Sequence, residues 1–102
     1  MNTVQLISMH DIEKRYEPGY HHHWFDADTM RFFRTRLPQY GFEGPGGVFF
    51  VSSEQLHGMS GTKPRAYTVR QLVGKGNIQT VGEFNTMTRS QAIREAKRAA
   101  LG

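Results

Sequence analysis

The chain has 102 residues, of which 37% are hydrophobic and 12% aromatic. This length suits one domain with one modest core, and we predict a single domain over residues 1–102. The aromatic content argues against disorder, and no apolar stretch approaches the length that a membrane span needs. Because the chain lacks cysteine, disulfides, thiolate metal sites and cysteine nucleophiles are excluded.

Positive charge is concentrated at the C-terminal end. The chain carries a formal net charge of +4; residues 1–62 hold five basic and seven acidic residues, whereas residues 63–102 hold eight and two. This asymmetry is typical of a basic face that meets phosphates or an acidic protein, although an ordinary solvated surface is the alternative. The N-terminus has neither the basic start nor the apolar run of a secretory signal, so we expect a cytoplasmic protein without a membrane partner.

The first predicted elements are short. Alternating apolar and polar residues at 3–7 favour a strand. Ser8, followed three residues later by Asp11, is typical of a helix start, and the Pro-Gly pair at 18–19 ends that helix.

The next segment is less regular. The Asp and Thr side chains of residues 26–29 can cap a second short helix through residues 30–33, although a turn followed by a strand over 33–37 fits nearly as well. The glycines and prolines of residues 39–47 predict a loop.

The central part predicts strands. Residues 48–51 are apolar on both faces, as in a buried central strand, and residues 52–64 predict a mobile connection. Residues 67–73 and 78–84 alternate in polarity, and the intervening Gly-Lys-Gly-Asn of 74–77 predicts a hairpin turn between them.

A helix follows at the C-terminal end. Thr88 and Gln91 have the spacing of a capping box. The predicted buried face of this helix consists of Ala92, Ile93, Ala96, Ala99 and Ala100, with basic residues on the opposite face. The expected fold is α+β: a mainly antiparallel sheet of three or four strands, with a C-terminal helix packed on it and one or two short N-terminal helices.

A run of histidines raises the question of a metal site. His21 and His23 would point the same way in an extended chain, and a shell could be completed by Asp26, Asp28, His10 or His57. The spacing matches no established zinc signature, so we predict no metal site, while binding by His21 and His23 stays open. In the alternative, His22 or His23 packs near Trp24 and the others are solvated.

No group of residues in the sequence has the arrangement of a reaction site. Ser52, Ser53 and Ser60 lack the frame of a nucleophile elbow. Glu54 and His57 could exchange protons, but they lie in a polar, glycine-containing stretch, and no other residues beside them complete a reaction site. We therefore expect no enzyme, no catalytic residues and no cofactor.

The basic residues indicate a different role. The candidate nucleic-acid contacts are Arg65, Arg70, Lys75, Arg94, Lys97 and Arg98. Together they could border one surface of sheet and helix, with Tyr67 or Tyr40 available for base stacking. The alternative is that the basic residues of the last helix are only its solvated face.

Four sequence blocks resemble those of small uncharacterised proteins of bacteriophages and mobile elements. They are HHWFDADTMRFF (22–33), FFVSSEQ (49–55), PRAYTVR (64–70) and TVGEF (80–84). The resemblance implies an accessory protein of phage type, with no activity to transfer. Residues 67–101 are also weakly similar to the arm-type DNA-binding domains of phage integrases, which place a helix behind a three-stranded sheet.

Two functions follow as hypotheses. The first is a non-catalytic accessory protein that binds nucleic acid or a nucleoprotein through the basic surface. The second is an anti-CRISPR-like inhibitor that binds a host defence protein. Its predicted contact residues are the aromatics Trp24, Phe25, Tyr40 and Phe42. The sequence leaves the target and the oligomeric state open.

Overall fold

The computed structural model describes residues 3–15, 27–58, 61–62, 64–74 and 77–102. These residues form a five-stranded antiparallel sheet in the order β1-β2-β3-β6-β7. The strands are β1 (Gln5–Ser8), β2 (Tyr40–Gly44), β3 (Gly47–Glu54), β6 (Ala66–Val73) and β7 (Asn77–Val81). A separate two-stranded hairpin consists of β4 (His57–Gly58) and β5 (Gly61–Thr62).

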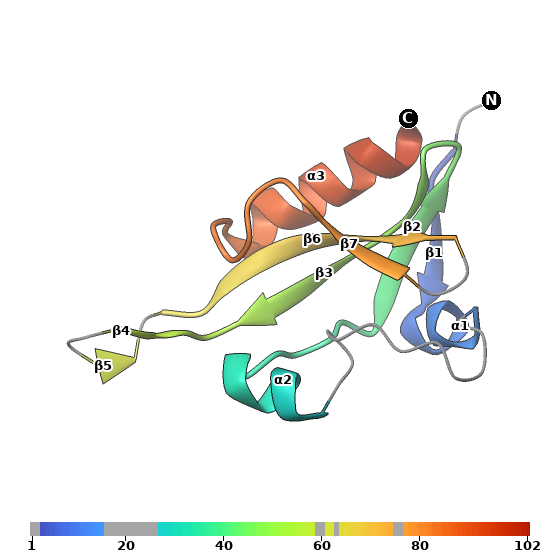
Figure 1. Ribbon diagram of the computed structural model, residues 1–102. Coiled ribbons are helices and arrows are strands. Elements are labelled where there is room, and N and C mark those ends of the chain that lie inside the picture. Colours follow the sequence, from blue (N-terminus) through green and yellow to red (C-terminus); the bar gives the residue numbers. More distant parts are fainter. Residues whose placement is uncertain (1–2, 16–26, 59–60, 63, 75–76) are drawn as a thin grey trace.

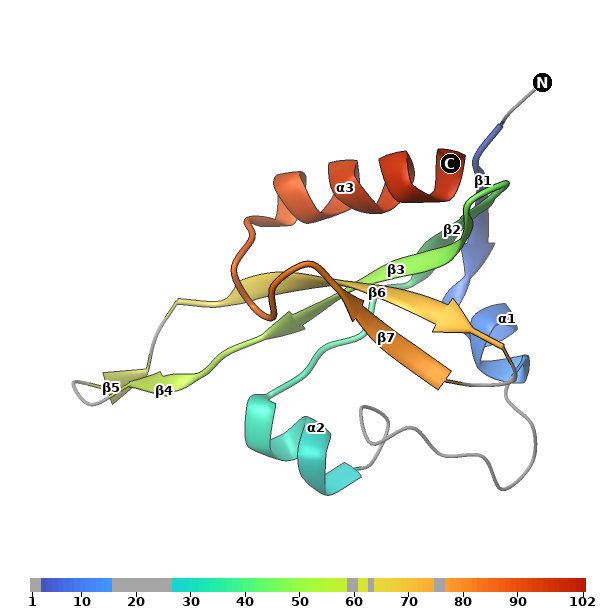
Figure 2. The same cartoon turned by 45° about the horizontal axis from the view of Figure 1, so that its top comes forward.

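Helices cover both faces of the sheet. α3 (Arg89–Leu101) lies across one face, and α1 (Met9–Lys14) and α2 (Ala27–Phe33) lie on the other (Figure 1; Figure 2). The predicted α+β fold is confirmed, with one strand more than expected. In the part of the chain that the structure describes, no helix has the length and apolarity needed to cross a membrane.

The additional strand is β2, in the segment for which the sequence predicts a loop. That prediction is wrong because the glycines of this segment allow close packing. A Cβ atom on Gly41 would lie 2.5 Å from Ile12 Cδ1, and one on Gly44 would lie 2.4 Å from the Ala100 carbonyl oxygen. β2 therefore fits tightly between the helices on the two faces of the sheet, and Phe42 contributes its ring to the core.

The segment after the apolar part of β3 is also more regular than expected. Ser52, Ser53 and Glu54 continue β3 and are buried, and the β4–β5 hairpin follows. The prediction of a connection over 52–64 is therefore wrong for residues 52–54 and for the two short strands, whereas residues 55, 56 and 64 do connect these elements. Polarity misleads here because these side chains find hydrogen-bond partners within the protein: the Ser52 hydroxyl donates to the Glu54 carboxylate, and the Ser53 hydroxyl accepts from Arg65.

The predicted starts of α1 and α3 are confirmed. The Ser8 hydroxyl accepts a hydrogen bond from the Asp11 amide at the start of α1, and Thr88 and Gln91 form the capping box of α3.

Helix α1 ends at Lys14, and the Pro-Gly pair at 18–19, which the sequence predicts to end it, lies outside the described residues. Helix α2 begins at Ala27, inside the segment that the sequence predicts to cap it. α2 forms in place of the alternative strand over 33–37, although Arg36 makes one isolated bridge to β3.

Each face of the sheet has its own apolar core. On the α3 face, three fully buried alanines let the helix backbone approach the sheet closely. This core consists of Phe42, Phe49, Val51, Val69, Ala92, Ala96 and Ala100. The core under α1 consists of Met9, Ile12, Val48, Phe50 and Ile78.

Candidate functional site

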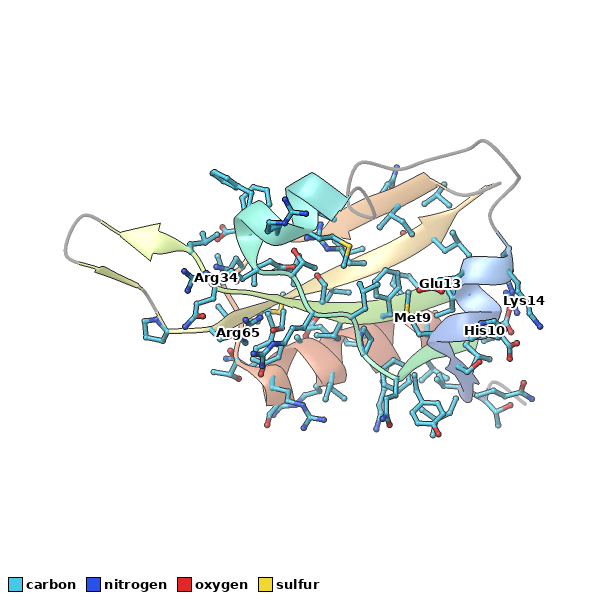
Figure 3. The ribbon with its side chains drawn as sticks, turned by 90° about the horizontal axis from the view of Figure 1, so that it is seen from below. Met9, His10, Glu13, Lys14, Arg34 and Arg65 are labelled. Atoms are coloured by element: carbon cyan, nitrogen blue, oxygen red, sulfur yellow. The ribbon has the colours of Figure 1, made fainter. Side chains whose placement is uncertain are left out.

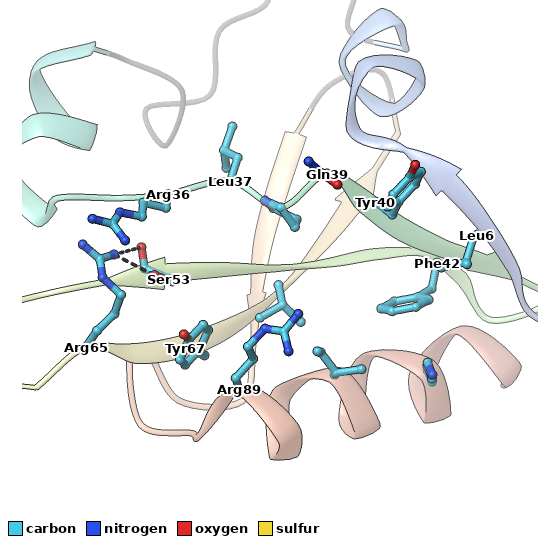
Figure 4. Close-up of a pocket in the computed structure, with 14 residues that line it drawn as sticks. Leu6, Arg36, Leu37, Gln39, Tyr40, Phe42, Ser53, Arg65, Tyr67 and Arg89 are labelled. Atoms are coloured by element: carbon cyan, nitrogen blue, oxygen red, sulfur yellow. Dashed lines mark hydrogen bonds between the residues drawn. The ribbon is translucent and has the colours of Figure 1, made fainter.

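A groove of about 530 Å³ opens between α3 and the segment that leads into β2 (Figure 4). We call it the basic groove. It is lined by Leu6, Arg36, Leu37, Pro38, Gln39, Tyr40, Phe42, Val51, Ser53, Arg65, Tyr67, Arg89, Ile93 and Lys97. Four of these described lining residues are basic and none is acidic, so positive charge in the groove meets no opposing charge from its own walls.

Two isolated backbone bridges bring the walls of the groove together. Arg36 and Ser53 exchange hydrogen bonds, with N–O distances of 2.8 and 3.0 Å, and thereby hold the segment after α2 beside β3. Tyr67 and Met87 exchange a second pair, of 2.9 and 3.2 Å, and place the start of α3 beside β6. Basic residues far apart in the sequence therefore face the same space.

Arg65 is fixed at one end of the groove. Its Nη1 donates to the hydroxyl and the carbonyl oxygen of Ser53 at 2.6 and 3.1 Å (Figure 4). The same atom donates to the carbonyl oxygen of Arg34 at 2.9 Å. All three acceptors are uncharged, so these bonds orient the guanidinium without neutralising it. Partial burial, and then repulsion from the charge of Arg36, lowers the pKa of Arg65. An anion at this point would relieve that repulsion.

α3 supplies the other two positive charges. Arg89 and Lys97 lie eight residues apart, with Ile93 midway between them, so all three lie along one side of the helix. The Lys97 ammonium lies 5.5 Å from the centroid of the Phe42 ring, a distance at which a cation and an aromatic face attract. This contact directs Lys97 over the groove.

The rest of the groove surface is apolar or aromatic. Leu6 and Tyr40 are 68% and 55% exposed, a large fraction for side chains of this type. Tyr67 is half-buried beside Arg89 (Figure 4). The groove therefore combines cations with rings and an apolar floor.

A second hollow continues from the Arg65 end. It has a volume of about 550 Å³ and shares Arg36 and Arg65 with the basic groove. Its full lining is Met30, Arg31, Arg34, Thr35, Arg36, Gln55 and Arg65. Arg34 and Arg65 lie close together near the end of α2, away from the exposed side chains of α1 (Figure 3).

The structure separates the predicted nucleic-acid residues. Arg65 and Lys97 line the groove, whereas Arg94 and Arg98 are exposed on another side of α3. The Arg98 guanidinium also pairs with Glu95, one turn away on the helix. Lys75 lies outside the described residues.

The prediction for Arg70 is wrong, because this residue is 1% exposed and cannot reach an external phosphate. Its Nη2 lies 3.3 Å from Oε2 of Glu54, which is fully buried. Its Nε donates to the Ser52 hydroxyl at 2.9 Å, its Nη1 donates to the Thr80 hydroxyl, and its guanidinium lies 5.2 Å from the Phe84 ring centroid. Burial lowers the pKa of Arg70, and the Glu54 charge acts in the opposite direction.

Glu54, which could exchange protons with His57 according to the sequence, is part of the same buried cluster. Its carboxylate accepts hydrogen bonds from the Ser52 hydroxyl at 2.6 Å and the Thr68 hydroxyl at 2.7 Å. The Thr68 hydroxyl in turn accepts a hydrogen bond from the backbone N–H of Asn85 at 2.7 Å. The carboxylate is thus enclosed by structural partners and has no access to a substrate.

The predicted aromatic docking residues are also divided. Tyr40 is exposed, whereas Phe42 is 8% exposed and belongs to the core, so the prediction of Phe42 as an exposed contact is wrong. A strand buries alternate side chains that a glycine-rich loop would have exposed. Trp24 and Phe25 lie outside the described residues.

Within the described residues, no group of three or more His, Asp or Glu side chains could hold a metal ion. The histidines that raise this question, His21 and His23, lie outside those residues.

Arg36 and Arg89 are the basic residues of the groove that the sequence did not predict as contacts. The spacing of Arg89, Ile93 and Lys97 could have placed Arg89 on the same side of the helix as Lys97. Arg36 had no comparable signal, because it reaches the groove through a bridge to a residue 17 positions later in the chain.

Comparison with protein families adds an affiliation. Residues 8–98 match the family of unknown function DUF7447. The chain belongs to this family. The DUF7447 match includes all four basic residues of the groove, but it assigns neither an activity nor a bacteriophage or integrase origin. No curated protein and no solved structure matches the chain.

Proposed function

We propose that this protein is a non-catalytic accessory protein that binds nucleic acid through the basic groove. The observation that carries the proposal is the convergence of Arg36, Arg65, Arg89 and Lys97 on one concave surface whose described lining has no carboxylate. Positive side chains arranged in this way gain affinity by neutralising phosphates and releasing counterions. In this proposal the protein acts in the cytoplasm, as a phage-type accessory protein does in its host.

The arrangement favours a polyanion over a small anion. The four charges come from separate segments and are spread along the groove, and two more arginines border the adjoining hollow. A chain of phosphates can contact several of these groups at once, whereas a single phosphate reaches only a few. Tyr40 and Tyr67 add rings on which bases can stack.

Binding can be tested with labelled DNA of about 20 nucleotides, as a single strand and as a duplex, by fluorescence anisotropy over a series of salt concentrations. We expect log affinity to fall linearly with log salt. The double variant Arg36→Gln/Lys97→Gln should weaken binding to all sequences alike. For a single strand, the slope of log affinity against log salt should become less steep by about 0.7 for each phosphate contact that is lost.

The matched control is Arg94→Gln/Arg98→Gln. It removes the same charge from exposed positions outside the groove, and we expect it to change affinity by less than about threefold. Equal effects of the two double variants, or an affinity that does not respond to salt, would contradict the proposal.

The apolar half of the same groove favours a second candidate, an anti-CRISPR-like inhibitor that binds a protein. Leu6 and Tyr40 are exposed side by side on the sheet face, where a partner could bury them. This candidate predicts a stoichiometric complex in nuclease-treated host lysate that Tyr40→Ala abolishes. The first candidate predicts no such complex.

A further inference from the structure

We infer that the basic groove binds single-stranded nucleic acid, with unpaired bases on its floor and phosphates along its cations. This inference rests on the proposed function and goes further by naming the form of nucleic acid. Three observations support it: the exposed floor, the alternation of cations and rings, and the path beyond Arg65.

The floor of the groove exposes apolar surface that a ligand with apolar faces could cover. Leu6 and Tyr40 expose large apolar surfaces within a concave site, and Tyr67 adds a second ring. The flat face of a base can cover such surfaces, but bases offer their faces only when they are unpaired and unstacked. A duplex presents phosphates and groove edges to a protein, so it would leave this floor uncovered.

Cations and rings alternate along the groove. Arg36 and Arg65 lie at one end, Tyr67 and Arg89 lie in the middle, and the exposed ring of Tyr40 lies at the other end (Figure 4). At that end the Lys97 ammonium lies over the Phe42 ring. A single strand repeats a phosphate and a base in turn, and it can place each next to a matching group.

The cationic surface turns a corner at Arg36 and Arg65. These residues border both the basic groove on the α3 face and the hollow beside α2 on the opposite face. A flexible single strand can follow this bend past Arg36 and Arg65. DNA duplex has a persistence length of about 150 base pairs, so bending it over so short a distance is costly.

The experiment compares three labelled probes of equal length at one salt concentration. They are a mixed-sequence DNA single strand, its duplex, and an abasic single strand that keeps the sugar-phosphate chain but lacks bases. We expect the single strand to bind at least about tenfold more tightly than either other probe, because only it can stack bases on the tyrosines.

Two variants test whether the tighter binding of the single strand depends on the rings of the groove floor. Tyr40→Ser should weaken binding of the single strand by about tenfold and leave the abasic probe unchanged. The matched control is Phe32→Ser, which removes an aromatic ring that is 76% exposed on α2 and lies outside the groove lining. It should leave binding of all three probes unchanged.

The outcomes separate this inference from the proposed function. If the duplex or the abasic strand binds as tightly as the single strand, and Arg36→Gln/Lys97→Gln weakens that binding, the inference is wrong and the proposed function stands. If no probe binds, or binding does not depend on the groove charges, both are wrong. Capture of a protein through Tyr40 without any binding of DNA would also overturn both.

Discussion

Arg65 lies directly before β6 and Arg70 lies within it, but their guanidinium groups have different surroundings. Arg70 faces the α2 side of the sheet, where Glu54 and three hydroxyl-bearing strand residues enclose a buried cluster. Arg65 faces the α3 side, where Ser53 and two carbonyl oxygens hold it at the end of an open groove. A buried arginine with a carboxylate partner stabilises the fold, whereas an oriented arginine without one keeps its charge available to a ligand.

The difference follows from strand geometry. Side chains alternate between the two faces of a sheet, so residues an odd number of positions apart face opposite sides. On β3 the same alternation sends Ser52 and Glu54 to the closed cluster and Ser53 to the groove. Adjacent residues of one strand thus serve stability and, in our proposal, binding.

The largest expected effect is on the closed side. Arg70→Met should destabilise the protein by about 3–5 kcal/mol, because it leaves the Glu54 carboxylate buried without its charged partner. Urea unfolding measures this loss. The double variant Glu54→Leu/Arg70→Met removes both charges and should recover at least half of it. A loss below about 1 kcal/mol in the single variant would show that the ion pair is not essential to the fold.

The neighbouring serines provide a matched pair. Ser52→Ala removes a hydroxyl that both accepts from Arg70 and donates to Glu54, so the unfolding free energy should fall by about 1–3 kcal/mol. Ser53→Ala removes an acceptor of Arg65 at the groove and should cost less than about 1 kcal/mol, because solvent can replace it. Equal losses in the two variants would mean that the two faces are not distinct in this way.

Arg65→Met is the direct counterpart of Arg70→Met. Its effect on stability should be about 0.5–1.5 kcal/mol, since it loses hydrogen bonds only to uncharged acceptors. Its effect on affinity for the DNA single strand should be about tenfold, because the lost contact involves a charged group. Loss of stability comparable to that of Arg70→Met would contradict the assignment of Arg65 to the groove.

The smallest expected effect on stability comes from a third arginine, Arg15. Arg15 forms a bidentate ion pair with Glu43, in which Nη1 lies 2.6 Å from Oε2 and Nη2 lies 3.0 Å from Oε1. Both side chains are partly exposed. The hydrogen bonds from Arg15 lower the pKa of Glu43, so the pair stabilises the fold above the ordinary carboxyl range and loses its effect as pH falls through the lowered pKa. The contribution should be about 0.2–1 kcal/mol.

Urea unfolding of the wild type and of Glu43→Gln, from about pH 7 to about pH 3, measures this contribution. The difference between the two proteins should shrink toward low pH. A difference that grows as pH falls would have the wrong sign and would contradict the assignment.

Local patterns in the sequence were enough to predict several elements. Ser8 and Asp11 marked the start of α1, and Thr88 and Gln91 marked that of α3. Ala92, Ala96 and Ala100 lie on the buried face of α3 as predicted, whereas Ile93 and Ala99 are only partly buried. These signals depend on residues three or four positions apart, whose interaction is fixed by helix geometry alone. The strand β6 was recognised in the same way, from alternation within its own residues.

The candidate site depended on contacts between distant residues. The sequence placed Arg65 and Arg70 in one binding surface, because nothing local distinguishes an arginine with a buried partner from one without. The partner of Arg70 lies 16 residues earlier in the chain, and only the register of β3 against β6 brings it within reach.

The sequence by itself determined the class of fold, the starts of α1 and α3, and the presence of excess positive charge. The tertiary structure decided which of those charges are buried, which meet in one groove, and that the glycine-rich segment around Gly41 and Gly44 is a strand. The physical reason is that burial and charge pairing depend on which segments come together in space, whereas caps and periodicity depend only on neighbours along the chain.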